Sequence, residues 1–174
     1  DEVVNGVTVG RGAGAVSTNT AVGASALAAN STGNQNVAVG YSAGAATTGS
    51  QGLTYVGYQA GNSNLTGSRN TNIGWNAGFT DTTSFNVFVG SRAGYLANGG
   101  SNTAVGDYAL SSVTGASTGA SNVAMGQGTL QYNTSGSYNT GLGTNALTSN
   151  TTASNNTAVG YQAGYSNTTS SYTT

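Results

Sequence analysis

Very few side chains in this sequence could perform acid–base, nucleophilic or metal chemistry. The 174 residues include no His and no Cys, and the four acidic residues are Asp1, Glu2, Asp81 and Asp107. Two carboxylates that hydrolyse a glycosidic bond must lie within about 5–10 Å of each other. Asp81 and Asp107 occupy different positions of the repeat described below, so we do not expect them to share a face. The sequence therefore predicts no enzyme activity and no catalytic residue.

Sequence motifs for phosphate, metal or nucleic-acid binding are also missing. No G-x-x-x-x-G-K-[ST] loop occurs, and three Asp residues cannot supply the recurring Asp of a calcium-binding β-roll. Arg11, Arg69 and Arg92 are too few to neutralise a duplex backbone, and we expect them to bond turn carbonyls or neighbouring chains. No apolar run approaches the ~20 residues that cross a bilayer. We expect no cofactor, metal, nucleic acid or membrane insertion in this segment.

A short phrase recurs along the chain and must position every other side chain. It reads NVAVGYSAGAAT at 36–47, NTNIGWNAGFTD at 70–81 and NTAVGYQAGYSN at 156–167. We align the copies on the glycine that follows a large aliphatic residue, called the anchor glycine below. Ten units result, with anchors spaced mostly by 16 or 17 residues, which is typical of a solenoid. The anchors after Gly10 are Gly23, Gly40, Gly57, Gly74, Gly90, Gly106, Gly126, Gly143 and Gly160.

The composition of each unit favours β-structure over helix. Glycine and β-branched residues are poor helix formers, and 16–17 residues must also contain the turns. The Thr-Ala-Val before many anchors fits a short strand with Thr and Val on one face and Ala on the other. We expect a second short strand in the x-x-A-G/L phrase after the anchor, and turns in the Asn, Ser, Thr and Gly segments. The predicted fold is all-β: a repetitive parallel β-solenoid of about ten coils.

Stacked coils turn equivalent positions into columns. We expect the aliphatic residues before the anchors to form an internal core, and the asparagines four residues before the anchors to form a hydrogen-bonded ladder. The predicted core comprises Val22, Val39, Val56, Ile73, Val89, Val105, Met125, Leu142 and Val159. The predicted ladder comprises Asn36, Asn70, Asn86, Asn102, Asn122, Asn139 and Asn156. The insertion SVTGASTGASN at 112–122 is expected to bulge outward without changing the stack.

A single chain of this kind is expected to be too thin to be stable alone. Ordering a residue costs about 1–2 kcal/mol of backbone entropy, whereas burying one Val returns about 1.5–3 kcal/mol. Tyr55, Phe88 and Trp75 also require apolar surroundings, which an interface between chains would supply. We therefore predict an oligomer in which chains lie side by side around an axis.

The N-T-A-V-G-x-x-A-G/L unit resembles the repeats in the heads of trimeric autotransporter adhesins of the YadA-like type, which read roughly N-S-x-A-I-G. It is also similar to bacteriophage tail-fibre repeats, in which NTAVGYQAL-type phrases follow an opening like GVTVGRGAG, here at 6–14. This resemblance covers roughly residues 6–164. It implies a left-handed β-roll, an obligate homotrimer, and a stiff extracellular shaft or head. The longer spacing here departs from the adhesin repeat and implies longer turns.

Three segments and three functional hypotheses follow. The segments are an N-terminal lead-in at 1–5, the ten-repeat solenoid at 6–164, and a partial linker or truncated next repeat at 165–174. Because the chain starts at Asp1, we expect a processed chain or an excerpt from a longer one. The leading hypothesis is a non-enzymatic phage tail-fibre segment of the virion that takes part in host attachment, with further fibre or virion proteins as partners. The alternatives are a bacterial cell-surface adhesin or self-assembling extracellular filament, and an ice-binding solenoid, against which the irregular Thr positions count.

Aromatic residues follow the anchor in three successive units. Tyr41, Tyr58 and Trp75 are expected to align as a stripe, and Tyr161 occupies the same position near the end. An exposed stripe could contact the sugar rings of a cell-surface glycan, whereas a covered stripe would fill grooves between chains. Asn-x-Ser/Thr sequons, which we interpret as chance in so polar a chain, occur at Asn30, Asn64, Asn133, Asn150 and Asn167.

Overall fold

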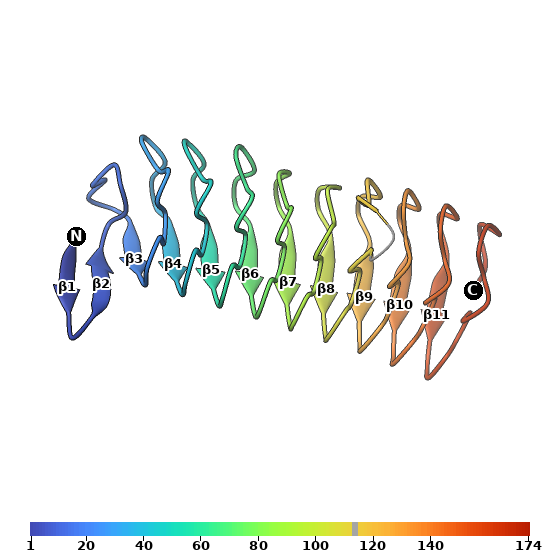
Figure 1. The fold of residues 1–174 in the computed structure, drawn as a ribbon. Helices are drawn as coiled ribbons and strands as arrows, with labels where there is room; N and C mark the ends of the chain where they lie inside the picture. The colour runs from blue at the N-terminus through green and yellow to red at the C-terminus, as the bar shows by residue number, and fades with distance from the viewer. Residues whose placement is uncertain (113–114) are drawn as a thin grey trace.

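The computed structural model describes residues 1–112 and 115–174. Over these residues the chain forms eleven short strands and no helix, and the strands follow one another in sequence order in a single sheet (Figure 1). The predicted all-β solenoid is confirmed. The strands are β1 Glu2–Val4, β2 Val7–Gly10, β3 Thr20–Val22, β4 Val37–Val39, β5 Thr54–Val56, β6 Thr71–Ile73, β7 Val87–Val89, β8 Thr103–Val105, β9 Val123–Met125, β10 Thr140–Leu142 and β11 Thr157–Val159.

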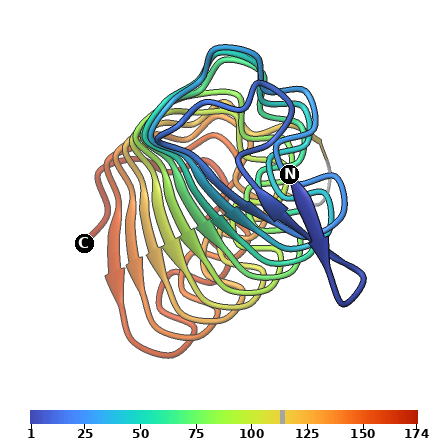
Figure 2. The same cartoon turned by 90° about the vertical axis from the view of Figure 1, so that its left-hand side faces the viewer.

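The N-terminal end is built differently from the rest of the solenoid. Strand β1 pairs antiparallel with β2, and β2 pairs antiparallel with β3. Asn5 and Gly6 join β1 to β2 with φ of +49° and +82°, the left-handed pair that an Asn-Gly hairpin turn requires. The first of the ten expected units is therefore one arm of a hairpin that projects from the coils (Figure 2). Nine parallel strands, β3–β11, remain.

Strands β3–β11 stack in parallel with equivalent residues side by side. Ala38 of β4, for example, pairs with Ala21 of β3 and Tyr55 of β5. The long interval between β8 and β9 leaves this register unchanged, since Thr103 pairs with Val123. The insertion therefore keeps the stack in register, as predicted, although its residues 113–114 lie outside the described part of the chain.

The interior is filled by the middle residue of each strand, which corrects the predicted core. Ala38, Tyr55 and Phe88 are fully buried, whereas Leu142 is 45% exposed and Val159 is 65% exposed. Neighbouring residues of a strand point to opposite faces, so when the middle residue points inward the first and last residues of the same strand point outward. The residues predicted as core instead lie on the outer face, half-buried or exposed: Val22, Val39, Val56, Ile73, Val89, Val105, Met125, Leu142 and Val159.

The interior of each coil lies between the strand on one side and the turns after the anchor on the other. A coil with a bulky side chain on one of these two walls has a small residue on the other. Tyr55 and Phe88 fill it from the strand, and glycines stand opposite them at Gly61 and Gly94. A Cβ at Gly61 would clash with the Tyr55 ring. In other coils Leu fills the interior from the opposite wall, and the strand then carries Ala or Gly. Tyr55 and Phe88 therefore lie inside the coil and do not need the interface between chains that the sequence had predicted for them.

The phrase after each anchor is a run of turns, not the expected second strand. In the coil of Gly57, the backbone adopts positive φ at Gly57 (+135°), Gln59 (+53°) and Gly61 (+58°). Such alternation prevents an extended conformation. The anchor must be glycine because of its positive φ. It must also be glycine because a Cβ on Gly57 would clash with the carbonyl oxygen of Gly74 in the next coil.

Candidate functional site

Two columns of uncharged side chains cover the outer face of strands β3–β11. The first residue of each strand is Thr in six strands and Val in three, and the last is an aliphatic residue in all nine. Alternation along the strand directs both columns outward. Ile73 and Met125 are 36% and 41% exposed. A continuous exposed face of this kind, with no charged residue in either column, is typical of a surface that another molecule covers.

The predicted asparagine ladder lies in the interior, and its bonds run mainly from side-chain amide to backbone. The Oδ1 of Asn122 accepts the backbone N–H of Asn139 in the next coil at 2.9 Å, and its Nδ2 donates to the carbonyl of Gly136 at 2.9 Å. Each asparagine thus satisfies backbone groups that the turn would otherwise leave unpaired. The fully buried ladder residues are Asn36, Asn70, Asn86, Asn102, Asn122, Asn139 and Asn156.

A second column of buried asparagines, seven residues after the anchors, was missed from the sequence. Asn30, Asn64, Asn133 and Asn150 are buried, and each Nδ2 donates to the carbonyl oxygen three residues later. These are four of the five sequons. Their recurrence at one repeat position was the available signal, and it indicates a turn-stabilising role. Their burial closes them to glycosylation in the folded chain.

Asp81 occupies the same column position and places a carboxyl group in the interior. Its Oδ1 accepts hydrogen bonds from Asn86 Nδ2 at 2.8 Å and Thr83 Oγ1 at 3.3 Å, and its Oδ2 accepts one from Asn72 Nδ2 at 3.4 Å. Burial raises the pKa of Asp81 to about 6, and the hydrogen bonds limit that rise. Burial also raises the pKa of Tyr55, whose Oη accepts a hydrogen bond from Asn64 Nδ2.

Asp81 is fully buried, so no substrate can reach it. Asp107 lies elsewhere, on the surface side of the turns.

Two residues of the predicted aromatic stripe stack on each other, and the third, Trp75, is exposed in the next coil. The rings of Tyr41 and Tyr58 stack with centroids 5.3 Å apart and planes 15° apart. Tyr41, Tyr58 and Trp75 are 51%, 46% and 43% exposed. Tyr161 is exposed but does not join them, because the four coils between carry no aromatic residue at this position. Stacking uses one ring face of Tyr41 and one of Tyr58, so a ligand meets mainly ring edges and hydroxyl groups.

An arginine extends the stripe, which sequence reasoning did not foresee. The guanidinium carbon of Arg92 lies 4.5 Å from the ring centroid of Trp75, 5.1 Å from that of Tyr108 and 5.9 Å from that of Tyr95. Its Nη1 donates to the Tyr108 hydroxyl. Phe79 packs on Tyr95 with centroids 5.4 Å apart. Arg92 therefore binds aromatic rings of its own chain, where the sequence had predicted turn carbonyls or neighbouring chains.

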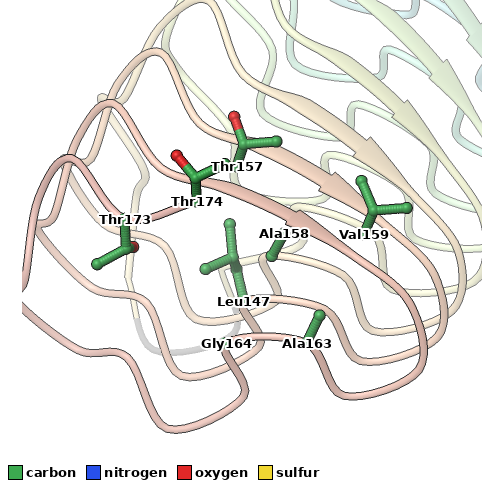
Figure 3. Close-up of a pocket in the computed structure, with 8 residues that line it drawn as sticks. All are labelled: Leu147, Thr157, Ala158, Val159, Ala163, Gly164, Thr173 and Thr174. Carbon is green, nitrogen blue, oxygen red and sulfur yellow. The ribbon is translucent and has the colours of Figure 1, made fainter.

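A hollow of about 280 Å³ lies at the last coil, between β11 and the C-terminal residues (Figure 3). Leu147, Ala158 and Ala163 form its apolar wall, and Thr157 and Thr173 lie at its edge. These side chains continue the core column beyond β11. No charged residue lines the hollow, so its chemistry is that of the solenoid core.

Within residues 1–112 and 115–174 there is no group of three or more acidic, His or Cys side chains placed to hold a metal ion. The same residues contain no helix that is long and apolar enough to cross a membrane. Comparison with known proteins found no matching family model, no matching curated protein and no matching solved structure.

Proposed function

We propose that this chain is a non-enzymatic segment of an extracellular fibre, most simply a phage tail fibre of the virion that takes part in host attachment. The observation that carries this proposal is the unbroken parallel register from β3 to β11, which an insertion of several residues leaves intact. A stack without breaks in pairing makes a stiff rod, and side chains that repeat along a rod serve spacing and adhesion better than catalysis.

We further propose that the fibre is a homotrimer, in which sister chains cover the outer face of the strands. The outward position of Ile73, Met125 and Leu142 supports this, because these large apolar side chains of the strand face are exposed in a lone chain. Removing such side chains from water yields about 25 cal/mol per Å² of apolar area. The homotrimer expected from the resemblance would thus draw its stability from the aliphatic column that the sequence had placed inside the coil.

Substitutions on the outer face test this assembly. The wild-type chain is expected to scatter light as a particle of three times 16.9 kDa. The pair Ile73→Asp and Leu142→Asp should reduce the mass to one chain, because charges would be buried at the interface. The matched pair Thr48→Asp and Ser166→Asp, at exposed turn positions, should leave the mass unchanged. A wild-type chain that stays a folded monomer at micromolar concentration would refute the trimer.

Two alternatives use the same architecture. A bacterial surface adhesin or extracellular filament would also need a stiff repetitive rod, and the sequences that flank this segment in its gene would distinguish it from a phage fibre. The second alternative is ice binding, which is supported by the position of the Thr and aliphatic columns on one outer face. Val replaces Thr at Val37, Val87 and Val123, however, which interrupts the hydroxyl spacing. Thermal hysteresis of the purified chain would decide this alternative.

A further inference from the structure

The surface around Arg92 combines features that no other part of the described chain has together. Arg92 is half-buried, and Trp75, Tyr95 and Tyr108 surround its guanidinium group. These four residues, with Phe79 packed on Tyr95, are called the Arg92 patch below. They come from the turn runs after successive anchors, so they lie beyond the anchor glycines and not in the two columns of the outer strand face.

The guanidinium group of Arg92 is held in place without a neutralising acid as hydrogen-bond partner. Its hydrogen bond goes to the uncharged hydroxyl of Tyr108, and its Nε is buried with no partner among the described residues. Aromatic faces stabilise a cation and restrict its orientation. The Arg92 side chain therefore loses little conformational entropy when a ligand binds. Because the Nε is buried and Nη1 already donates one hydrogen bond to Tyr108, a ligand can reach the guanidinium group only through its two Nη groups.

A planar guanidinium group whose Nη ends still carry unbonded N–H groups prefers one class of ligand. It bonds carboxylates in a two-pronged geometry that a neutral hydroxyl cannot match. Trp75 remains 43% exposed, so part of its ring is available to contact apolar C–H groups of a ligand. A single arginine cannot bind a nucleic-acid backbone, which requires many phosphate contacts. Carboxylate and sugar together specify a uronic acid.

We propose that the Arg92 patch binds a carboxylated sugar, the uronate unit of an acidic cell-surface polysaccharide. Arg92 binds the carboxylate through its Nη groups, and the exposed part of the Trp75 ring contacts the C–H groups of the sugar. Tyr41 and Tyr58 continue the contact surface along the rod toward the N-terminal coils. This inference deepens the proposed host attachment and rests on it for its biological meaning, although binding itself can be measured without it.

Asp107 is expected to weaken uronate binding at the Arg92 patch, so substituting it tests the direction of the electrostatic effect. It occupies the stripe position of the next coil, immediately before Tyr108 in the sequence. A carboxylate on this surface repels a carboxylated ligand at Arg92, and the repulsion is screened by salt. Removing the charge of Asp107 should therefore strengthen uronate binding, whereas removing the charge of Arg92 should weaken it.

Calorimetric titration with hexagalacturonate, and with its methyl ester as the uncharged control, tests the proposal. The wild-type chain should bind the acid at least tenfold more tightly than the ester. Arg92→Gln should lose at least tenfold in affinity for the acid, Arg92→Lys should lose less, and Asp107→Asn should gain up to about threefold. Arg69→Gln is the matched control, because Arg69 lies over the Phe85 ring at another site and its removal should have little effect.

Each outcome of this titration decides the inference. Equal affinity for acid and ester, equal losses in Arg92→Gln and Arg69→Gln, or no uronate binding by the folded wild-type chain would overturn it. The same samples should be examined by light scattering. Uronate binding by a monomer would overturn the proposed trimer alone, and a stable trimer that does not bind uronate would overturn the Arg92 patch alone.

Discussion

The central coils and the C-terminal coils fill the same narrow interior with large side chains from opposite walls. In the central coils, Tyr55 and Phe88 fill the interior from the strand and glycines stand opposite. In the C-terminal coils, Leu130 and Leu147 fill it from the turn wall, and the strand carries Ala124 or Gly141. A large side chain on one wall is therefore paired with a small residue on the other. In the coil of Ala38 and Gly44 both walls are small, and Leu27 and Tyr55 of the neighbouring coils reach into the space.

The two regions also differ in polarity. The central coils bury Asn72 and the carboxyl group of Asp81, and carry the Arg92 patch on their surface. The C-terminal coils bury no acidic residue. Buried polar groups reduce stability unless all are hydrogen-bonded. Asn72 Oδ1, Asn76 Oδ1 and Arg92 Nε are buried without partners in the central coils, whereas Asn150 Oδ1 is the one such atom among the described residues after β9. The central region is thus expected to be the less stable one, and it holds the side chains best suited to bind a ligand.

The largest loss of stability is expected when a bulky residue is placed opposite Tyr55 in a central coil. Gly61→Leu places a side chain into the Tyr55 ring and should prevent folding, at a cost above about 4 kcal/mol. The double variant Gly61→Leu with Tyr55→Ala recreates the pairing of the C-terminal coils and should recover most of the lost stability. Urea denaturation of the three variants measures this. A double variant no more stable than Gly61→Leu would show that the walls do not share volume.

Loss of one ladder asparagine in a C-terminal coil should have the next largest effect. Asn122→Ala removes the acceptor of the Asn139 N–H and leaves that buried backbone group unpaired, whereas the Gly136 carbonyl keeps its hydrogen bond from Asn133 Nδ2. At about 1–3 kcal/mol for an unsatisfied buried group, a loss of up to about 3 kcal/mol is expected. Hydrogen exchange of the Asn139 amide should accelerate in the variant. An unchanged denaturation midpoint would contradict a structural role for the ladder.

The central coils should also respond to pH in a distinctive direction. The pKa of Asp81 is raised from 3.8 to about 6 on folding, so between these values the folded chain holds a proton that the unfolded chain has released. Stability is therefore greatest below about pH 4 and falls as pH rises to about 6, by about 3 kcal/mol in total. Denaturation midpoints at pH 4.5 and 7.5 measure the fall.

Two variants assign that pH dependence. Asp81→Asn should abolish most of the fall and stabilise the chain at pH 7.5, because an amide keeps the size without the buried charge. Asp107→Asn, which changes a residue outside the core, should leave the fall in place. Stability that rises between pH 4.5 and 7.5 in the wild-type chain would contradict a raised pKa at Asp81.

The smallest effect on stability is expected at the aromatic stripe. Trp75→Ala and Tyr58→Ala remove side chains that are nearly half exposed, so each should cost about 1 kcal/mol of unfolding free energy. Adhesion to cells should be lost while the mass in light scattering is kept. Dissociation of the assembly in either variant would instead indicate that the rings pack between chains.

The sequence was informative about what repeats, and less so about which side faces inward. Period, register and the asparagine ladder could be predicted, because equivalent positions of stacked coils must meet, whereas the second asparagine column was interpreted as chance. The inward face could not, since Thr-Ala-Val alternates in the same way whichever side is inside, and burial of the larger residue was assumed. The opposing choices at Tyr55 and Gly61 were visible in the sequence and would have indicated the correct face.

Other differences arose from local signals that compete with the repeat. The Asn5-Gly6 pair makes a hairpin and removes the first unit from the stack. Within the Arg92 patch, Arg92 and Tyr108 each stand two residues after their anchors, and Phe79 and Tyr95 each stand five residues after theirs, so the alignment of units could have placed both pairs side by side. Trp75 stands one residue after its anchor, and only the structure shows that its ring lies against Arg92.

Small-angle X-ray scattering of the purified chain would test the central claim most directly, because one measurement yields both mass and length. Chains that lie side by side through their outer strand faces should give three times 16.9 kDa in a rod whose length stays that of one chain, roughly 50 Å from the spacing of stacked strands. A particle with the mass of one chain, or a rod whose length grows in proportion to its mass, would contradict it.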